Sequence, residues 1–309
     1  MPTLLITHPI CLLHEMGEHH PESPDRLRVI LQALETQEFV YLVRMEAPLA
    51  DRAALERVHD PAYVADILDN GPATGHRHLD ADTGMSPASA EAALRAAGGA
   101  CAAVDAVMTG EARNVFCAVR PPGHHAERAR AMGFCLFNNV AVAAYHARAA
   151  HGIRRVAVVD FDVHHGNGTQ DEFWEDGSLF YASSHQWPAY PGTGREHDHG
   201  VAGNIVNVPL APGSGSEEFR RAYSEIILPA LSNFKPELLI ISAGFDAHAR
   251  DPLAYLRVQT EDFGWVTREL LKVADACCKG RVVSCLEGGY DLQALSMSVA
   301  AHMRALMGH

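Results

Sequence analysis

Short apolar runs rich in β-branched residues alternate with segments of helical periodicity along the whole chain. The runs predict strands at 3–8, 40–45, 114–119, 154–161, 179–184, 204–209, 237–243 and 281–286. Helices are expected at 24–37, 86–109 (opened by Ser86-Pro87), 138–150, 216–233, 260–278 and 292–307. This alternation favours an α/β fold with a mostly parallel sheet and helices on both faces. Because no repeat or linker divides the chain, we expect one domain over 1–309.

Long loops rich in glycine, proline and histidine follow the predicted strands. They cover 9–23, 120–136, 162–169, 185–203, 244–258 and 287–291. In a parallel sheet the loops after strands lie along one edge, where open α/β folds place their sites. Residues far apart in the sequence are therefore expected to meet there.

The stretch Asp-Phe-Asp-Val-His-His-Gly-Asn-Gly, residues 160–168, ends one of the most apolar predicted strands. Charged groups at the end of a buried strand are costly to desolvate unless something pairs with them. Asp160, Asp162 and His164 are two residues apart, so in extended chain they point to the same side. Three such donors at a strand end suit a cation.

Three further loops carry acid–base or metal-ligand groups: RPPGHHA with His124 and His125, SAGFDAH with Asp246, and LEGGYD with Tyr290. Each motif alone is typical of a turn or of surface histidines. Four of them at the same edge of a sheet instead indicate a metal-dependent hydrolase.

The ligand types suggest how such a site works. Asp162, His164 and Asp246 provide three protein ligands and leave open positions, as in a catalytic zinc site. Zinc lowers the pKa of bound water and polarises a carbonyl.

A general base and an oxyanion donor complete the predicted site. His124 and His125 are both candidates for the base, and Tyr290, after two glycines, is the candidate donor. Asp160 and Asn167 are expected to orient the two imidazoles.

Composition restricts the partners. A net charge of −13 argues against nucleic acid, and seven cysteines without framework spacing predict reduced thiols and a cytoplasmic setting. MPTLLITHPICLLH lacks a basic region followed by a long apolar one, and no run has the length of a membrane span. We therefore expect neither export nor a membrane anchor.

The motifs RPPGHHA, GFCLFNNVAVAA, VDFDVHHGNGTQ, YPGTG, SAGFDAH and LEGGY together resemble the histone deacetylase family, which includes the acetylpolyamine amidohydrolases. The resemblance runs from HPESPDRL to LEGGYDL, nearly the whole chain. It implies an arginase-like α/β fold with an eight-stranded parallel sheet and a zinc-dependent deacylase site.

By this resemblance, the site residues take specific roles. The zinc ligands would be Asp162, His164 and Asp246, and the catalytic groups His124, His125 and Tyr290. The substrate tunnel would be lined by Gly133, Phe134, Tyr190, Leu253 and Asp82. A structural potassium ion is expected near Asp160, Asp162, the His164 carbonyl, Ser183 and Ser184. Phe134 and Tyr190 as packing residues, and Asp82 as a turn residue, remain alternatives.

Departures from the family pattern refine the prediction. Asn167 stands where the class I branch has Asp, so the sequence resembles the class II branch, and the histidine bonded to Asn167 should be the less basic of the pair. Leu253 occupies the position of an acidic gatekeeper in polyamine-selective relatives. A two-manganese site would need carboxylates at Gly166 and His248, so one metal ion is expected, with His248 left open as an extra ligand.

Three functions are compatible with these features. The first is removal of an acyl group, in the main reading acetyl, from the ε-amine of lysine in proteins or peptides. The second is deacetylation of polyamines or other small N-acetyl amines, which a narrow tunnel rim formed by 9–23 would favour. The third is a non-catalytic protein that binds acyl-lysine. The sequence leaves open whether the chain forms a homo-oligomer.

Overall fold

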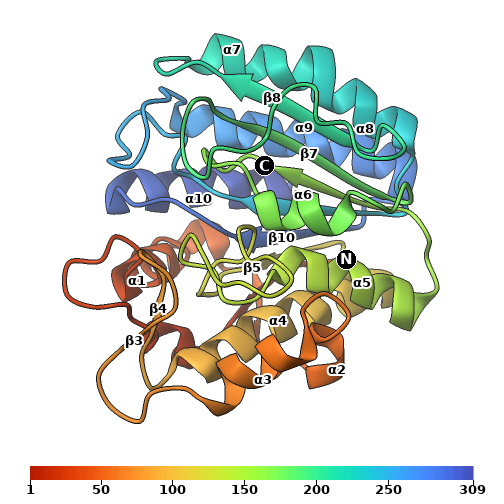
Figure 1. The fold of residues 1–309 in the computed structure, drawn as a ribbon. Helices are drawn as coiled ribbons and strands as arrows, with labels where there is room; N and C mark the ends of the chain where they lie inside the picture. Colours follow the sequence, from red (N-terminus) through yellow and green to blue (C-terminus); the bar gives the residue numbers. More distant parts are fainter. Residues whose placement is uncertain (309) are drawn as a thin grey trace.

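A computed structural model of the chain describes residues 1–308. Eight strands form one sheet in the order β2-β1-β5-β10-β9-β6-β7-β8, and every neighbouring pair is parallel (Figure 1). The strands are β1 Thr3–Thr7, β2 Val43–Glu46, β5 Asn114–Cys117, β6 Val156–Asp160, β7 Leu179–Gln186, β8 Ile205–Leu210, β9 Leu238–Ala243 and β10 Val282–Leu286. The eight predicted strands and the parallel sheet are thus confirmed.

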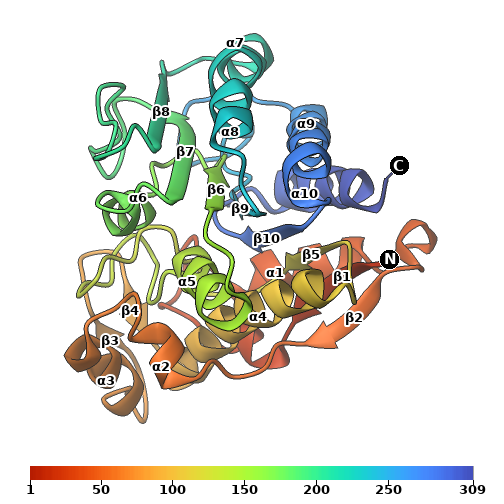
Figure 2. The ribbon, with the colours of Figure 1, turned by 90° about the vertical axis from the view of Figure 1, so that its right-hand side faces the viewer.

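Helices cover both faces of this sheet. Figure 2 shows α4 and α5 on one face and α7 to α10 on the other. The helices are α1 Pro24–Ala33, α2 Arg52–Leu55, α3 Pro61–Asp69, α4 Ser89–Thr109, α5 Asn139–His151, α6 Asn167–Phe173, α7 Ser216–Arg221, α8 Leu228–Phe234, α9 Thr260–Cys278 and α10 Leu292–Met307. None of the helices within 1–308 has the length and hydropathy to cross a bilayer.

The central strands are apolar because both of their faces are covered. Every residue of β6, β9 and β10 is buried, as expected for parallel strands between two helical layers. Asp160 at the end of β6 is therefore placed in a fully buried position at the carboxyl edge of the sheet.

Several predicted boundaries were wrong. The strand predicted at 40–45 begins at Val43, because Val40 and Tyr41 lie exposed on a turn. The helix predicted from residue 24 to 37 ends at Ala33, and Thr36 is extended before a short 3₁₀ turn, η2 Gln37–Phe39.

The helix predicted from residue 86 begins at Ser89 instead. The Ser89 hydroxyl accepts the Ser86 N–H at 2.7 Å and contacts His14 Nδ1 at 2.6 Å. These bonds hold 86–88 in a turn against the amino-terminal loop, so Ser86 does not cap the helix.

The helix predicted at 216–233 contains a π-helical segment, η3 Ala222–Ile227, between α7 and α8. The Tyr223 hydroxyl in this segment donates to the Asp160 carbonyl at 3.4 Å. Helical periodicity alone gives no sign of this insertion. The short hairpin of β3 Arg77–His78 and β4 Gly84–Met85, the small helices α2, α3 and α6, and the 3₁₀ turn η1 Pro9–Leu12 were also not predicted.

A buried ionic network ties the amino-terminal loop to the sheet. The Glu22 carboxylate accepts bonds from Arg120, just after β5, and from Arg26 in α1, with Arg26 Nη1 2.9 Å from Oε1. All three side chains are fully buried. Arg26 also donates to the carbonyls of Glu287 and Gly289 beyond β10. Three loops at the carboxyl edge are thereby held together by one carboxylate.

We predict that Glu22→Gln lowers the free energy of unfolding by about 3–5 kcal/mol, because two buried guanidinium groups lose their charged partner. Urea denaturation measures this loss. Asp69→Asn, which breaks an exposed ion pair with Arg52, is the control and should cost about 0–1 kcal/mol. Equal effects of the two substitutions would contradict the assignment.

Candidate active site

Two neighbouring strands bring three metal-ligand side chains together. Asp162 and His164 follow β6, and Asp246 follows β9, which pairs with β6. One ligand atom from each of the three lies within 4.8 Å of the others. His164 Nδ1 is 3.2 Å from Asp162 Oδ1 and 3.2 Å from Asp246 Oδ2, and the His164 side chain is 12% exposed. The three donors thus converge on one point that remains accessible.

The backbone fixes both carboxylates of this group. Gly288 N–H donates to Asp162 Oδ2 and Val163 N–H to Asp246 Oδ1, each at 2.8 Å. A Cβ at Gly244 or Gly288 would overlap these carboxylates. The glycines therefore leave room for a rigid, buried ligand set, which fits a metal ion.

The two buried carboxylates of this group also favour binding of a cation. Burial and the neighbouring Asp162 raise the pKa of Asp246 to about 7. Although burial opposes the charged imidazolium, bonds to the two carboxylates raise the pKa of His164 to about 10. A divalent ion with imidazole and carboxylate ligands would supply the positive charge that these acids require.

Two imidazoles lie beside the three ligands, with ring centroids 4.0 Å apart and ring planes tilted by 44°. His124 Nδ1 is 2.9 Å from Asp160 Oδ2, whereas His125 Nδ1 is 2.8 Å from the Asn167 side-chain oxygen. Burial disfavours the charged form of His124, but Asp160 and Asp162 raise its pKa well above its usual value. Burial and His124 hold the pKa of His125 well below its usual value. His125 is thus the less basic ring, as its amide partner predicts.

A cavity of about 190 Å³ opens onto these groups. It is lined by Asp82, His125, Gly133, Phe134, His164, Tyr190, Leu253 and Tyr290. The Phe134 and Tyr290 rings contact each other edge to face at 5.8 Å, and the His125 and Tyr190 rings at 5.2 Å. The five residues expected in the tunnel therefore share one cavity with three of the expected metal and catalytic residues.

The wall formed by Gly133 and Phe134 has an unusual backbone. Both residues have positive φ, 56° and 69°, and a Cβ at position 133 would overlap the His125 ring. A phenylalanine in this region is strained. Phe134 N–H donates to Thr83 Oγ1 at 2.9 Å and Gly133 N–H to Asp82 Oδ1 at 3.2 Å. Asp82 thus holds the cavity wall in place.

Four residues that shape the site had no predicted role. Asp251 accepts the Tyr290 N–H at 2.7 Å, and the Arg26 guanidinium lies 4.9 Å from the Tyr290 ring centroid. The Glu287 carboxylate accepts the N–H of Gly123 at 2.7 Å. Arg26 and Glu287 stand within HPESPDRL and LEGGYD, so these motifs were the available signal.

The fourth residue is His20 in the 9–23 loop. Its Nε2 is 3.1 Å from the Asp82 carbonyl, and its ring lies 4.8 Å from the Phe134 ring. The loop therefore contacts the cavity wall.

His248, considered as an extra zinc ligand, and Ser183 and Ser184, expected near potassium, lie outside the group of Asp162, His164 and Asp246. The two ring nitrogens of His248 contact Thr260 Oγ1 and the Arg250 N–H, so this side chain is engaged elsewhere. Ser183 is paired in register with Asp160. The Ser184 hydroxyl donates to Tyr223 at 3.2 Å. Both serines thus flank the end of β6 without joining the three-ligand cluster.

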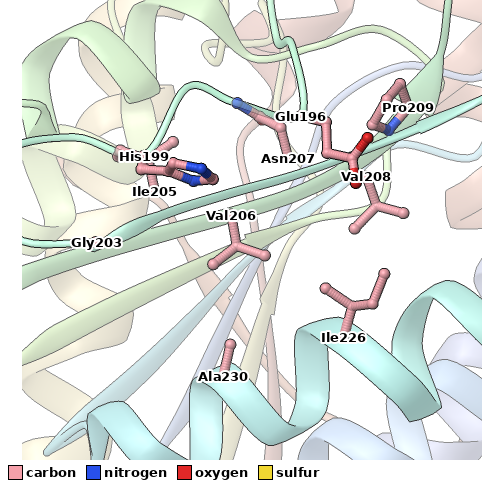
Figure 3. Close-up of a pocket in the computed structure, with 10 residues that line it drawn as sticks. All are labelled: Glu196, His199, Gly203, Ile205, Val206, Asn207, Val208, Pro209, Ile226 and Ala230. Atoms are coloured by element: carbon pink, nitrogen blue, oxygen red, sulfur yellow. The ribbon is translucent and has the colours of Figure 1, made fainter.

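A larger hollow of about 380 Å³ lies between β8 and the helical layer (Figure 3). Val206, Val208 and Pro209 on the strand and Ile226 and Ala230 on the helices line it, with His199 and Glu196 at its margin. None of the metal-ligand clusters found within 1–308 lies there. The larger of these two cavities is thus not the one that contains the candidate metal ligands.

Known proteins similar to this chain are histone deacetylases and related amidohydrolases. A family model described as "Histone deacetylase domain" matches residues 20–306. The chain is 41% identical to "Histone deacetylase 14, chloroplastic" of Arabidopsis thaliana, over 94% of this chain and 74% of that protein. It is 38% identical to "Histone deacetylase-like amidohydrolase" of Pseudomonas aeruginosa, over 91% and 80%. The crystal structure of the HDA15 HD domain aligns with a TM-score of 0.94 and 38% identity, over 100% of this chain and 88% of that one.

We predict that Gly288→Ala weakens binding of Zn²⁺ at the three-ligand group, because the added methyl displaces the carboxylates of Asp162 and Asp246. Metal analysis after dialysis against a series of zinc buffers measures the affinity. Gly215→Ala is the control, since a Cβ there meets nothing closer than 3.5 Å. Unchanged zinc affinity in Gly288→Ala would show that these carboxylates do not bind the ion.

Proposed function

This chain belongs to the histone deacetylase family and is a deacetylase, and we propose that it is zinc-dependent and removes an acetyl group from the ε-amine of lysine in proteins or peptides. The observation that carries the proposal is the shared cavity, in which His125, His164 and Tyr290 face the same space between two aromatic walls.

Asp162, His164 and Asp246 would hold a single catalytic zinc ion. When bound there, zinc supplies a Lewis acid that polarises the amide carbonyl and activates a water molecule. Gly166 and His248 stand where a second catalytic ion would need carboxylates, which supports one ion in this cavity.

The two histidines take different parts in the proton transfers. The low pKa of His125 keeps it neutral near pH 7, so it can accept a proton from the attacking water and later give that proton to the departing amine nitrogen. His124 is charged because of Asp160 and offsets the negative charge that develops beside it. Its imidazolium remains protonated throughout.

Tyr290 is proposed to donate its phenolic hydrogen bond to the carbonyl oxygen as that oxygen becomes negative. Burial raises the pKa of the phenol well above its usual value, so the proton needed for donation is retained. Asp251 and Arg26 hold the backbone of 289–290 in place.

The cavity wall supports an acetyl-lysine side chain as substrate. Phe134 and Tyr190 present aromatic faces suited to an aliphatic chain, and Leu253 adds apolar surface without a carboxylate. The contact of His20 with the wall supports the second candidate, a small acetylated polyamine, because the 9–23 loop reaches the cavity.

Turnover of an acetyl-lysine peptide and of N-acetylated polyamines, measured side by side on zinc-loaded protein, tests the proposal. A higher kcat/KM for the peptide supports it, and a higher value for the polyamine replaces it with the second candidate. No turnover of either substrate by zinc-loaded protein would mean that the acetylated substrate belongs to neither class.

Further features complete the proposal. A potassium ion is proposed near Asp160, Asp162, the His164 carbonyl, Ser183 and Ser184, supported by the in-register pairing of Asp160 with Ser183.

A cytoplasmic location is supported by the free thiols of all seven cysteines, although two of the relatives are named chloroplastic. The net charge of −13 supports the absence of a nucleic-acid partner.

We predict that Tyr290→Phe lowers kcat by about 10²–10³-fold, because one oxyanion donor is lost. Zinc content and substrate KM should stay near their wild-type values. Tyr255→Phe is the control, since Tyr255 is 74% exposed, and should keep full activity. Near-full turnover by Tyr290→Phe would mean that another group stabilises the oxyanion.

We predict that Asn167→Asp shifts the acidic limb of kcat/KM to higher pH by about 1 unit or more, because a carboxylate 2.8 Å from His125 favours its imidazolium. Since the proposed base must be neutral, activity is lost as pH falls through the pKa of His125. Asn233→Asp adds the same charge on an exposed helix and should leave the limb in place. An unmoved limb in Asn167→Asp would remove His125 from the role of base.

A further inference from the structure

A second cluster of metal-ligand side chains lies outside the cavity, where α4 packs against α5. Asp105 comes from α4, and His146 and His151 come from α5. His146 Nε2 is 2.8 Å and His151 Nε2 is 2.7 Å from the same Asp105 oxygen, Oδ1. One ligand atom from each residue lies within 4.8 Å of the others, and residues 1–308 contain one further cluster of this kind, the candidate catalytic one.

We propose that Asp105, His146 and His151 bind a divalent transition-metal ion of the zinc or nickel type. Two imidazoles and one carboxylate are ligands that such ions prefer. Donors around a tetrahedral ion at ~2.0–2.2 Å lie ~3.3 Å apart, so the cluster must open by roughly half an ångström to admit one. The histidine side chains are each 19% exposed and Asp105 is 49% exposed, which permits this adjustment and leaves a position for water.

The surroundings of the cluster favour a cation. His151 is the last residue of α5, and Asp105 lies in the last turns of α4. The carboxyl ends of both helices, where the helix dipole is negative, are therefore close by. The nearby cation on α5, Arg148, is paired with Asp176 at 2.6 Å. Arg148 is thus paired with a carboxylate other than Asp105.

The cluster is separate from the catalytic groups. α5 ends at His151 and the chain then enters β6 at its amino end, Val156, whereas the catalytic residues follow the carboxyl end of β6. The length of this five-residue strand, about 16 Å, lies between the two sites. An ion here would join two helices on one face of the sheet without taking part in the hydrolysis.

Calorimetric titration of zinc-loaded protein with NiCl₂ or ZnCl₂ tests the proposal. We expect one additional ion per chain in the wild type. In His146→Gln/His151→Gln its affinity should fall by roughly 100-fold or more, because two of three ligands are lost. His197→Gln, which removes an exposed histidine from another loop, should bind the additional ion like the wild type.

Two further variants separate this site from the catalytic one. Asp246→Ala removes a ligand of the cavity cluster and should keep the site at α4 and α5. Asp105→Asn keeps the side-chain volume and should lose the additional ion. It tests the same site if the double variant is too unstable to measure. Deacetylase activity of the double variant should match the wild type. Absence of an additional ion in the wild type, or its persistence in both the double variant and Asp105→Asn, would overturn the proposal.

Discussion

Buried negative charge is the constraint on which the structure of this site depends. Asp160, Asp162, Asp246 and Glu287 all lie at the carboxyl end of the central strands with almost no exposure. Burying ionised carboxylates is costly unless cations or hydrogen-bond donors compensate. Backbone N–H groups, imidazoles and the proposed metal ion provide that compensation. A Cβ at Gly166, Gly244 or Gly288 would overlap one of the three aspartate carboxylates, so these glycines let the backbone approach them closely.

The same constraint separates the two imidazoles chemically. His124 and His125 are adjacent in sequence and equally buried, yet one faces a carboxylate and the other an amide. Burial and the charged His124 lower the pKa of His125, whereas Asp160 and Asp162 raise the pKa of His124 in spite of burial. Because Asn167 is a neutral amide, it favours the charged form of His125 less than a carboxylate would.

Some of this site could be predicted from local pattern. The position of the loops after parallel strands was sufficient to predict that Asp162, His164 and Asp246 meet. The two-residue spacing was not, because β6 ends at Asp160, whose carboxylate bonds His124 instead of joining the ligand group. The hairpin that carries Asp82 was not predictable, because strands of two residues leave no periodic signal. The positive φ of Phe134 also has no local cause, since a hydrogen bond from its N–H to the distant Thr83 hydroxyl holds it there. The contacts of His20 and Asp251 likewise depend on loops that meet only in three dimensions.

The position of β10 has a consequence for how the protein matures. It is the last strand in the chain, yet it lies in the middle of the sheet, between β5 and β9. Before it is synthesised, the chain can form only two half-sheets, each with an open apolar edge. Such edges promote aggregation, and pairing across long sequence separations is slow. The sheet can therefore be completed only after residues 282–286 have been synthesised, and until then both half-sheets expose edges that favour aggregation.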